Sequence, residues 1–139
     1  MKKLFPKKKD VQNDKTMKII KLIDNDKYEV EQILRGHSDV VYKVIEIKQN
    51  ELISVSLDKN MKVWKYNNNG FNCITTIVFQ NIKSHCDIIK INEKEFVTSI
   101  KIDECIKFWN SNDYTNIATI NNISMNGSGK ILCLLNKNI

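Results

Sequence analysis

The chain has 139 residues, 42% of them hydrophobic and 27% charged, a balance that is typical of a globular protein and excludes a wholly disordered one. The net charge of +6 is concentrated near the start, because residues 1–27 contain nine Lys and four Asp while the rest of the chain is nearly neutral. The rest therefore lacks the clustered Lys and Arg that a nucleic-acid-binding surface requires.

The cysteine and histidine content argues against a metal site. The four Cys form no Cys-x-x-Cys pair and only two His are present, so no zinc-binding spacing can be assembled. No apolar run approaches the roughly 20 residues of a membrane span, and the basic start is not followed by the apolar region of a signal peptide. We therefore expect no metal, no cofactor, no membrane span and a cytoplasmic protein with reduced thiols.

Residues 1–16 form a Lys-rich segment that contains few apolar residues and is expected to be a disordered tail. Its run Lys7-Lys8-Lys9 offers a nuclear-localisation signal as the alternative to a solvated tail, so a nuclear location stays open. Residues 17–34 are then predicted to form two strands, 18–23 and 28–34, because Asp24-Asn25-Asp26 between them has the composition of a turn.

Two similar stretches follow at residues 35–79 and 80–120, each running from a His through short alternating strands to a Trp. The His residues (His37 and His85) are 48 positions apart, and the Trp residues (Trp64 and Trp109) are 45 apart. A period in the forties built of short strands indicates the blades of a β-propeller. The predicted strands are 40–47, 52–56, 61–66 and 73–79, then 88–91, 96–100, 106–109 and 116–120.

These stretches resemble the repeats of the WD-repeat β-propeller family. The resemblance implies an all-β fold, a partial propeller of about three blade equivalents made of four-stranded antiparallel sheets. Residues 17–34 would supply the two outer strands of one blade, with Ile23 where the family has its Trp, and residues 121–139 the two inner strands of another. Because propellers close with about four to eight blades, we expect a fragment of a longer propeller or a part that another chain completes.

The repeat contains the residue types of a Ser-His-Asp catalytic triad. Because the set recurs once per stretch at matched positions, a structural role is expected and the chain is not expected to be an enzyme. The resemblance implies one hydrogen-bonded tetrad per blade, in which a buried indole N–H reaches a carboxylate through a hydroxyl and an imidazole. The implied tetrads are His37, Ser54, Asp58 and Trp64, and His85, Ser99, Asp103 and Trp109. Ser56 and Thr98 are the alternatives to Ser54 and Ser99, since the register can differ by one or two residues.

Propellers of this family commonly bind peptides at the rim formed by the loop before the first strand of a blade and the turn between its second and third strands. Matching by position predicts the partner-binding residues Val40, Tyr42, Leu57, Ile88, Lys90 and Ile102. The alternative is that Val40 and Ile88 only cover the blade cores. The sequence thus predicts a non-catalytic protein–protein interaction scaffold. The alternative is a substrate-recruiting or regulatory part of a larger enzyme, such as a kinase or ubiquitin ligase assembly, whose catalytic domain is not in this chain.

Overall fold

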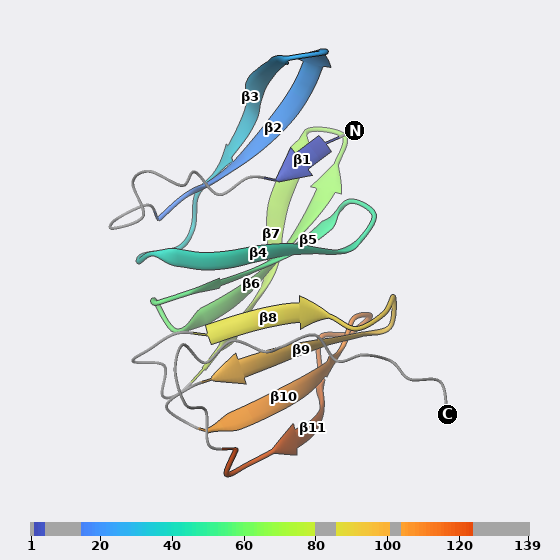
Figure 1. Cartoon of the computed structure of the whole chain (residues 1–139). Coiled ribbons are helices and arrows are strands. Elements are labelled where there is room, and N and C mark those ends of the chain that lie inside the picture. Colours follow the sequence, from blue (N-terminus) through green and yellow to red (C-terminus); the bar gives the residue numbers. More distant parts are fainter. Residues whose placement is uncertain (1, 5–14, 80–85, 101–103, 124–139) are drawn as a thin grey trace.

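A computed structural model describes residues 2–4, 15–79, 86–100 and 104–123, and these residues form strands and turns (Figure 1). The strands are β1 (Lys2–Leu4), β2 (Met17–Asp24), β3 (Lys27–Leu34), β4 (Val41–Lys48), β5 (Glu51–Ser56), β6 (Asn60–Asn67), β7 (Gly70–Val78), β8 (Cys86–Lys90), β9 (Glu95–Ile100), β10 (Cys105–Asn110) and β11 (Asn116–Ile120). Within these ranges no helix is long and apolar enough to cross a membrane.

The strands form three antiparallel sheets that lie one above the other (Figure 1). The first sheet has the order β1-β2-β3, the middle sheet β4-β5-β6-β7 and the third sheet β8-β9-β10-β11. Every strand of the middle and third sheets pairs with the strand next to it in sequence, which is the meander of a propeller blade. The predicted all-β fold of stacked blade-like sheets is therefore confirmed.

Both faces of the middle sheet are buried, which explains why every residue of β5 is buried. Successive side chains of a strand point to opposite faces. Ile53 and Val55 therefore join a core that includes Ile88 and Phe96 of the third sheet. Leu52, on the other face, joins the core shared with the first sheet, in which Met17, Ile19, Leu34, Trp64 and Phe71 are also buried.

A β-bulge recurs at the same place in all three sheets. The pairing shifts between Ile19 and Ile20, between Val63 and Trp64, and between Phe108 and Trp109. In each sheet the last strand therefore contains one extra residue: Glu31, Ile74 and Ile117.

The bulge fixes the register of the first sheet against the other two, and it corrects one prediction. Ile20, directly after the shift, occupies the place of Trp64 and Trp109. The prediction that Ile23 stands at the Trp position is wrong, since Ile23 lies three residues further, next to the β2–β3 turn, and is 57% exposed.

The N-terminal segment also differs from its prediction. Lys2–Leu4 forms a strand that pairs antiparallel with β2, through Lys3 opposite Ile20, whereas a disordered tail was expected for residues 1–16. This pairing gives the first sheet a third strand on the free edge of β2, where the other two sheets have their second strand. Residues 5–14 lie outside the described residues, as does most of the predicted inner-strand pair at 121–139.

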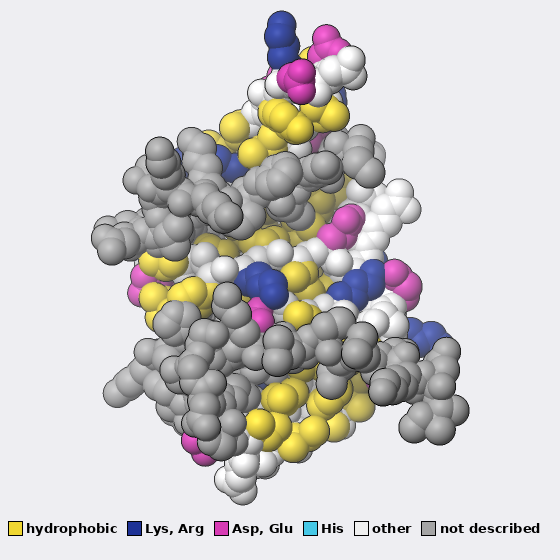
Figure 2. All heavy atoms as spheres, viewed as in Figure 1, with side chains coloured by type: hydrophobic (Ala, Val, Ile, Leu, Met, Phe, Trp, Pro, Cys, Tyr) yellow, Lys and Arg dark blue, Asp and Glu magenta, His cyan; other side chains and the backbone are white. Residues whose placement is uncertain are grey.

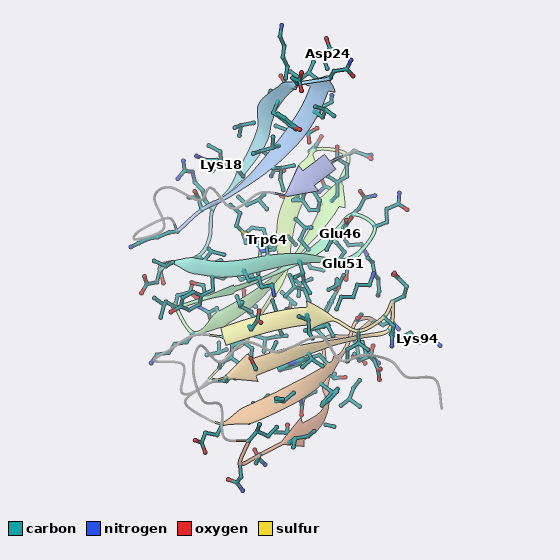
Figure 3. The ribbon with its side chains drawn as sticks, in the orientation of Figure 1. Lys18, Asp24, Glu46, Glu51, Trp64 and Lys94 are labelled. Atoms are coloured by element: carbon teal, nitrogen blue, oxygen red, sulfur yellow. The ribbon has the colours of Figure 1, made fainter. Side chains whose placement is uncertain are left out.

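Polar contacts join the middle sheet to the third sheet at the end that carries the β4–β5 and β10–β11 turns. Lys48 Nζ donates to the carbonyl oxygen of Ser111 and to Asn112 Oδ1, at 2.7 Å each. The hydroxyl of Tyr114 donates to Glu51 Oε1 at 2.6 Å. Burial and this bond to a carboxylate raise the pKa of Tyr114, so the phenol remains a donor. Figure 3 places Glu46, Glu51 and Lys94 at this end.

Gln32 joins the first sheet to the middle sheet. Its side-chain amide donates to the carbonyl oxygen of Phe71 and accepts from the amide N–H of Phe71, at 2.8 Å in each case. Gly70 allows this approach, because a Cβ there would lie 2.7 Å from Gln32 Oε1 and its φ of +117° suits glycine. One side chain thus satisfies both backbone groups of a residue on the neighbouring sheet.

We predict that Gln32→Ala lowers the free energy of unfolding by about 1–3 kcal/mol, because it leaves the partly buried backbone N–H and C=O of Phe71 without a hydrogen-bond partner. Urea unfolding monitored by circular dichroism measures this change. Glu29→Ala, at an exposed position of the same strand, is the control and should change stability by less than about 0.5 kcal/mol. Equal effects of the two variants would contradict the role given to Gln32.

Candidate functional site

Four side chains from separate elements of the middle sheet meet in one relay. His37 lies in the segment between β3 and β4, Ser54 on β5, Asp58 in the β5–β6 turn and Trp64 on β6. Trp64 Nε1 donates to Ser54 Oγ at 2.9 Å, Ser54 Oγ lies 2.7 Å from His37 Nε2, and His37 Nδ1 lies 2.7 Å from Asp58 Oδ2. With Nδ1 protonated and Nε2 accepting from the hydroxyl, every donor in the relay has an acceptor.

Burial and hydrogen bonds together set the protonation states of His37 and Asp58 in this relay. The side chains of His37 and Asp58 are each about 1% exposed. Desolvation lowers the pKa of His37 and outweighs the opposing effect of Asp58. Desolvation would raise the pKa of Asp58, but hydrogen bonds from the backbone of Ser38, from His37 and from the backbone of Asn60 lower it overall. A neutral imidazole therefore donates to an ionised carboxylate at neutral pH.

The relay also fixes the loop before β4 against the β5–β6 turn, and together these form one rim of the middle sheet. The backbone N–H of Ser38 donates to Asp58 Oδ2 at 2.9 Å, and the backbone N–H of Leu57 donates to the carbonyl oxygen of Val40 at 2.9 Å. Ser56 Oγ donates to the carbonyl oxygen of Asp39 at 3.0 Å. Ser56 thus belongs to the rim and is not the acceptor of the Trp64 indole.

In the third sheet the indole of Trp109 donates to Thr98 Oγ1 at 2.8 Å. The hydroxyl that accepts from this indole therefore belongs to Thr98, and the prediction that Ser99 supplies it is wrong. The physical reason is the two-residue period of a strand: Thr98 lies opposite Ile88, which is in the core between the middle and third sheets, and Ser99 lies on the other face. His85 and Asp103, the other members of this predicted tetrad, lie outside the described residues.

The observed register also changes which residue of the second stretch matches His37. Val44 lies opposite Ser54 and Ile88 opposite Thr98, so the two sheets are related by an offset of 44 positions at these strands. The predicted offset from His37 to His85 was 48. His37 lies four positions before the start of β4, whereas His85 lies one position before the start of β8, so counting from the two His residues does not bring the two strands into the same register.

Two of the residues predicted to bind a partner lie on the rim of the middle sheet, and a third, Tyr42, lies next to it on β4. Val40, Tyr42 and Leu57 are each half-buried, and the backbone hydrogen bond between Leu57 and Val40 brings two of them together. Tyr42 packs in part against the core between the middle and third sheets. Burial, Asp39 and Cys86 raise the pKa of its phenol.

Two other predicted partner-binding residues, Ile88 and Lys90, do not lie at a rim, and a third is outside the described residues. Ile88 has no exposed surface and belongs to the core. Lys90 is the last residue of β8, at the opposite end of the strand from the β9–β10 turn, where it pairs with Glu93. The prediction took Ile88 and Lys90 because they follow His85 at the same spacing at which Val40 and Tyr42 follow His37. Because β8 begins closer to His85 than β4 does to His37, both predicted residues lie further along the strand than their intended counterparts. Ile102 lies outside the described residues.

The relay has the residue types of a catalytic triad but not its accessibility. Ser54 is wholly buried, and its oxygen already accepts from an indole and faces an imidazole. A nucleophilic hydroxyl must reach a substrate, so this arrangement stabilises the fold. In the part of the chain that the structure describes, no group of three or more His, Cys, Asp and Glu could hold a metal ion.

The three stacked meanders and the buried indole relay define the fold as part of a β-propeller. The structure is similar to the WD40 beta propeller domain of Doa1, with a TM-score of 0.59 and 18% sequence identity over 76% of this chain and 33% of that chain. Over 72 residues the sequence is 29% identical to the UDP-galactose:fucoside alpha-3-galactosyltransferase of Dictyostelium discoideum, which covers 52% of this chain and 10% of that protein. No family model matches the chain.

The chain therefore spans about a third of the similar propeller structure and about a tenth of the similar curated protein. At these identities the likeness establishes the fold, a partial WD40-type propeller, and no more. The three described sheets match this partial propeller as the sequence predicted.

We predict that Trp64→Ala lowers the free energy of unfolding by about 3–5 kcal/mol, because it removes a buried aromatic side chain between the first and middle sheets. Lys65→Ala, at the next and exposed position of β6, serves as the control and should be nearly neutral. Chemical denaturation gives both values. Trp64 would have to be reassigned to the surface if a soluble quencher suppressed its fluorescence as fully as that of an exposed indole.

We predict that acidification destabilises the fold through His37. Its pKa in the folded chain lies below its ordinary value of 6.5, so the unfolded chain binds the proton first and the free energy of unfolding falls with pH below that value. The slope for one proton is at most about 1.4 kcal/mol per pH unit. Asp58, whose pKa is lowered, stays ionised over this range and does not contribute.

Denaturation of the wild type and His37→Gln at several values between about pH 7.5 and about pH 5.5 measures this slope. His37→Gln should have a flatter dependence, while His85→Gln, which removes the other histidine, controls for titration elsewhere. An unchanged slope in His37→Gln would show that His37 is protonated in the folded protein as readily as in the unfolded one.

Proposed function

We propose that this chain is part of a non-enzymatic protein-interaction scaffold of the WD-repeat type, and that the rim of the middle sheet binds an extended segment of a protein partner. The observation that carries the proposal is the combination of a rigid rim with apolar side chains that stay half-exposed. The loop before β4 and the β5–β6 turn are joined by four hydrogen bonds, Val40 and Leu57 lie on them, and Tyr42 lies beside them near the start of β4.

Rigidity is what makes this rim suited to binding. A surface loop that is ordered before it meets its partner loses less conformational entropy on association. A Tyr beside aliphatic side chains is the kind of anchor that dominates binding energies. Lys43 and Asp87 add an ion pair of 2.7 Å between β4 and β8, next to Tyr42, which holds the middle and third sheets together near this rim.

The similarity to a tenth of a galactosyltransferase favours a second candidate of a different class. In it, the same rim recruits a substrate protein for an enzyme, or regulates that enzyme, and the catalytic domain lies outside this chain. A kinase or ubiquitin ligase assembly would use such a part in the same way. Reading the coding sequence beyond both ends separates the candidates, because the second requires a catalytic domain there.

The remaining partner proposals follow from the charge distribution and the sheets. Because residues 28–139 are nearly neutral, we do not propose nucleic acid as a ligand of the sheets. Further sheets, from a longer chain or another polypeptide, are needed to complete the ring, since propellers have about four to eight blades. We place the protein in the cytoplasm, with Lys7-Lys8-Lys9 as a candidate nuclear-localisation signal.

The rim is tested with peptides selected from a displayed random library on the immobilised chain, whose affinity is then measured by fluorescence anisotropy. We predict that Leu57→Asp and Tyr42→Ala each weaken binding about tenfold or more, because each removes an apolar contact on the rim or next to it. Gln49→Ala, exposed in the β4–β5 turn at the other end of the sheet, should leave the affinity unchanged. Peptides that tolerate both rim variants, in protein of unchanged thermal stability, would refute the rim as the binding site.

A further inference from the structure

The first sheet has one covered face and one open face. Residues paired across the β2–β3 hairpin share a face, and Met17, Ile19 and Leu34 are buried against the middle sheet. The opposite side, here named the N-terminal face, is mainly apolar, with Lys18 as its one described charged residue at the paired positions Lys18–Ile33, Ile20–Val30 and Leu22–Tyr28. Leu22, Tyr28, Val30 and Ile33 are each at least 38% exposed. Figure 2 shows hydrophobic side chains on this hairpin below its charged tip, which Asp24 marks in Figure 3.

The repeated bulge shows what the N-terminal face corresponds to in the other sheets. Ile20 has the place of Trp64, and Tyr28 has the place of Phe71. Trp64 and Phe71 are buried against the first sheet, and Trp109 is buried against the middle sheet. In both described interfaces this side of a sheet is therefore covered by the sheet that precedes it. The N-terminal face has the same register and is also mainly apolar, but no described sheet precedes it.

In the described stack, the Trp side of a sheet packs against the opposite side of the sheet before it, which in the middle sheet is the side that carries Met61 and Val63. A sheet that covers the N-terminal face must present the corresponding side. The third sheet has such a side, here named the C-terminal face. Ile106 and Phe108 lie there at the places of Met61 and Val63. Their paired neighbours Ile120, Ala118, Val97 and Ser99 lie on the same side, as do Ile89 and Asp87 of β8. Met61 and Val63 have no exposed surface.

The C-terminal face, by contrast, is only partly covered. Val97 and Ser99 on β9 are buried, whereas Ile106 and Phe108 on β10 keep part of their surface and Ile120 on β11 is 49% exposed, so the open part of this face lies on β10 and β11. The chain thus carries the two unlike halves of an interface that it already forms twice internally, one half at each end of the stack of sheets.

We propose that two copies of this chain associate head to tail, with the N-terminal face of each copy on the C-terminal face of the other. Each contact repeats the sheet-on-sheet packing between the first and middle sheets and between the middle and third. Three sheets from each copy give a ring of six, which lies within the range in which propellers close. Unlike surfaces that meet twice in this way form a closed dimer. The inference rests on the proposed propeller architecture but not on the rim that binds a partner.

Sedimentation equilibrium of the purified full chain tests the proposal. The expected mass is twice the chain mass of 16.2 kDa and stays constant as the concentration rises. Val30→Lys on the N-terminal face and Ile120→Lys on the C-terminal face should each give monomers, because every contact in the ring uses one of each face. Ile117→Lys, at the bulge of β11 and 51% exposed, is the matched control and should remain a dimer.

Mixing the two monomeric variants distinguishes head-to-tail association from a symmetric contact. One Val30→Lys copy and one Ile120→Lys copy can still form one unaltered contact, so mixed dimers should return with weaker affinity. Circular dichroism shows whether each variant is folded, and Tyr28→Lys replaces Val30→Lys if the latter is not.

Three results would overturn the proposal. A monomeric wild type at about 100 µM would mean that another polypeptide, or more of a longer chain, covers the N-terminal face. A dimer that Val30→Lys disrupts and Ile120→Lys does not would mean that two N-terminal faces pack together. A mass that grows with concentration without a limit would mean an open filament. Peptide binding at the rim can persist in each case, so these failures are separable from a failure of the proposed function.

Discussion

The structure depends on the need of one buried indole for a hydrogen-bond acceptor. Trp64 packs between the first and middle sheets, and its N–H would be left unpaired there without the hydroxyl of Ser54. That hydroxyl is oriented by His37, and His37 by Asp58. Satisfying one donor thus links the loop before β4 to three further elements, so that a packing requirement in the core determines the shape of the rim above it.

The second constraint is that a blade cannot bury its own faces. β5 is wholly buried only because the first and third sheets cover the two sides of the middle sheet. Stability in such a stack comes from contacts between neighbours, and the outermost faces keep apolar surface. Gln32 and Lys48 show how polar side chains reinforce these contacts at opposite interfaces. The apolar N-terminal face is the consequence of this constraint at one end of the described stack.

Much of the fold was predictable because alternation and turn composition are local. The strands expected between residues 17 and 120 all occur, with ends that differ by a few residues. The failures concern register. Ile23, Ser99, Ile88 and Lys90 were each matched to the repeat by sequence position, which reveals neither a bulge nor a difference in turn or loop length between the sheets. Partners that lie far apart in sequence, such as Tyr114 and Glu51, left no local pattern that could have revealed them.

The sequence by itself determined the all-β meander, its period and the residue types of the relay, because strand alternation and a recurring Trp are written into short segments. Only the tertiary structure decided which hydroxyl meets each indole, which residues reach the rim and which apolar faces remain open. The reason is geometric. A shift of one residue turns a strand side chain from one face to the other, and the bulges and loop lengths that set this shift are fixed by packing between sheets.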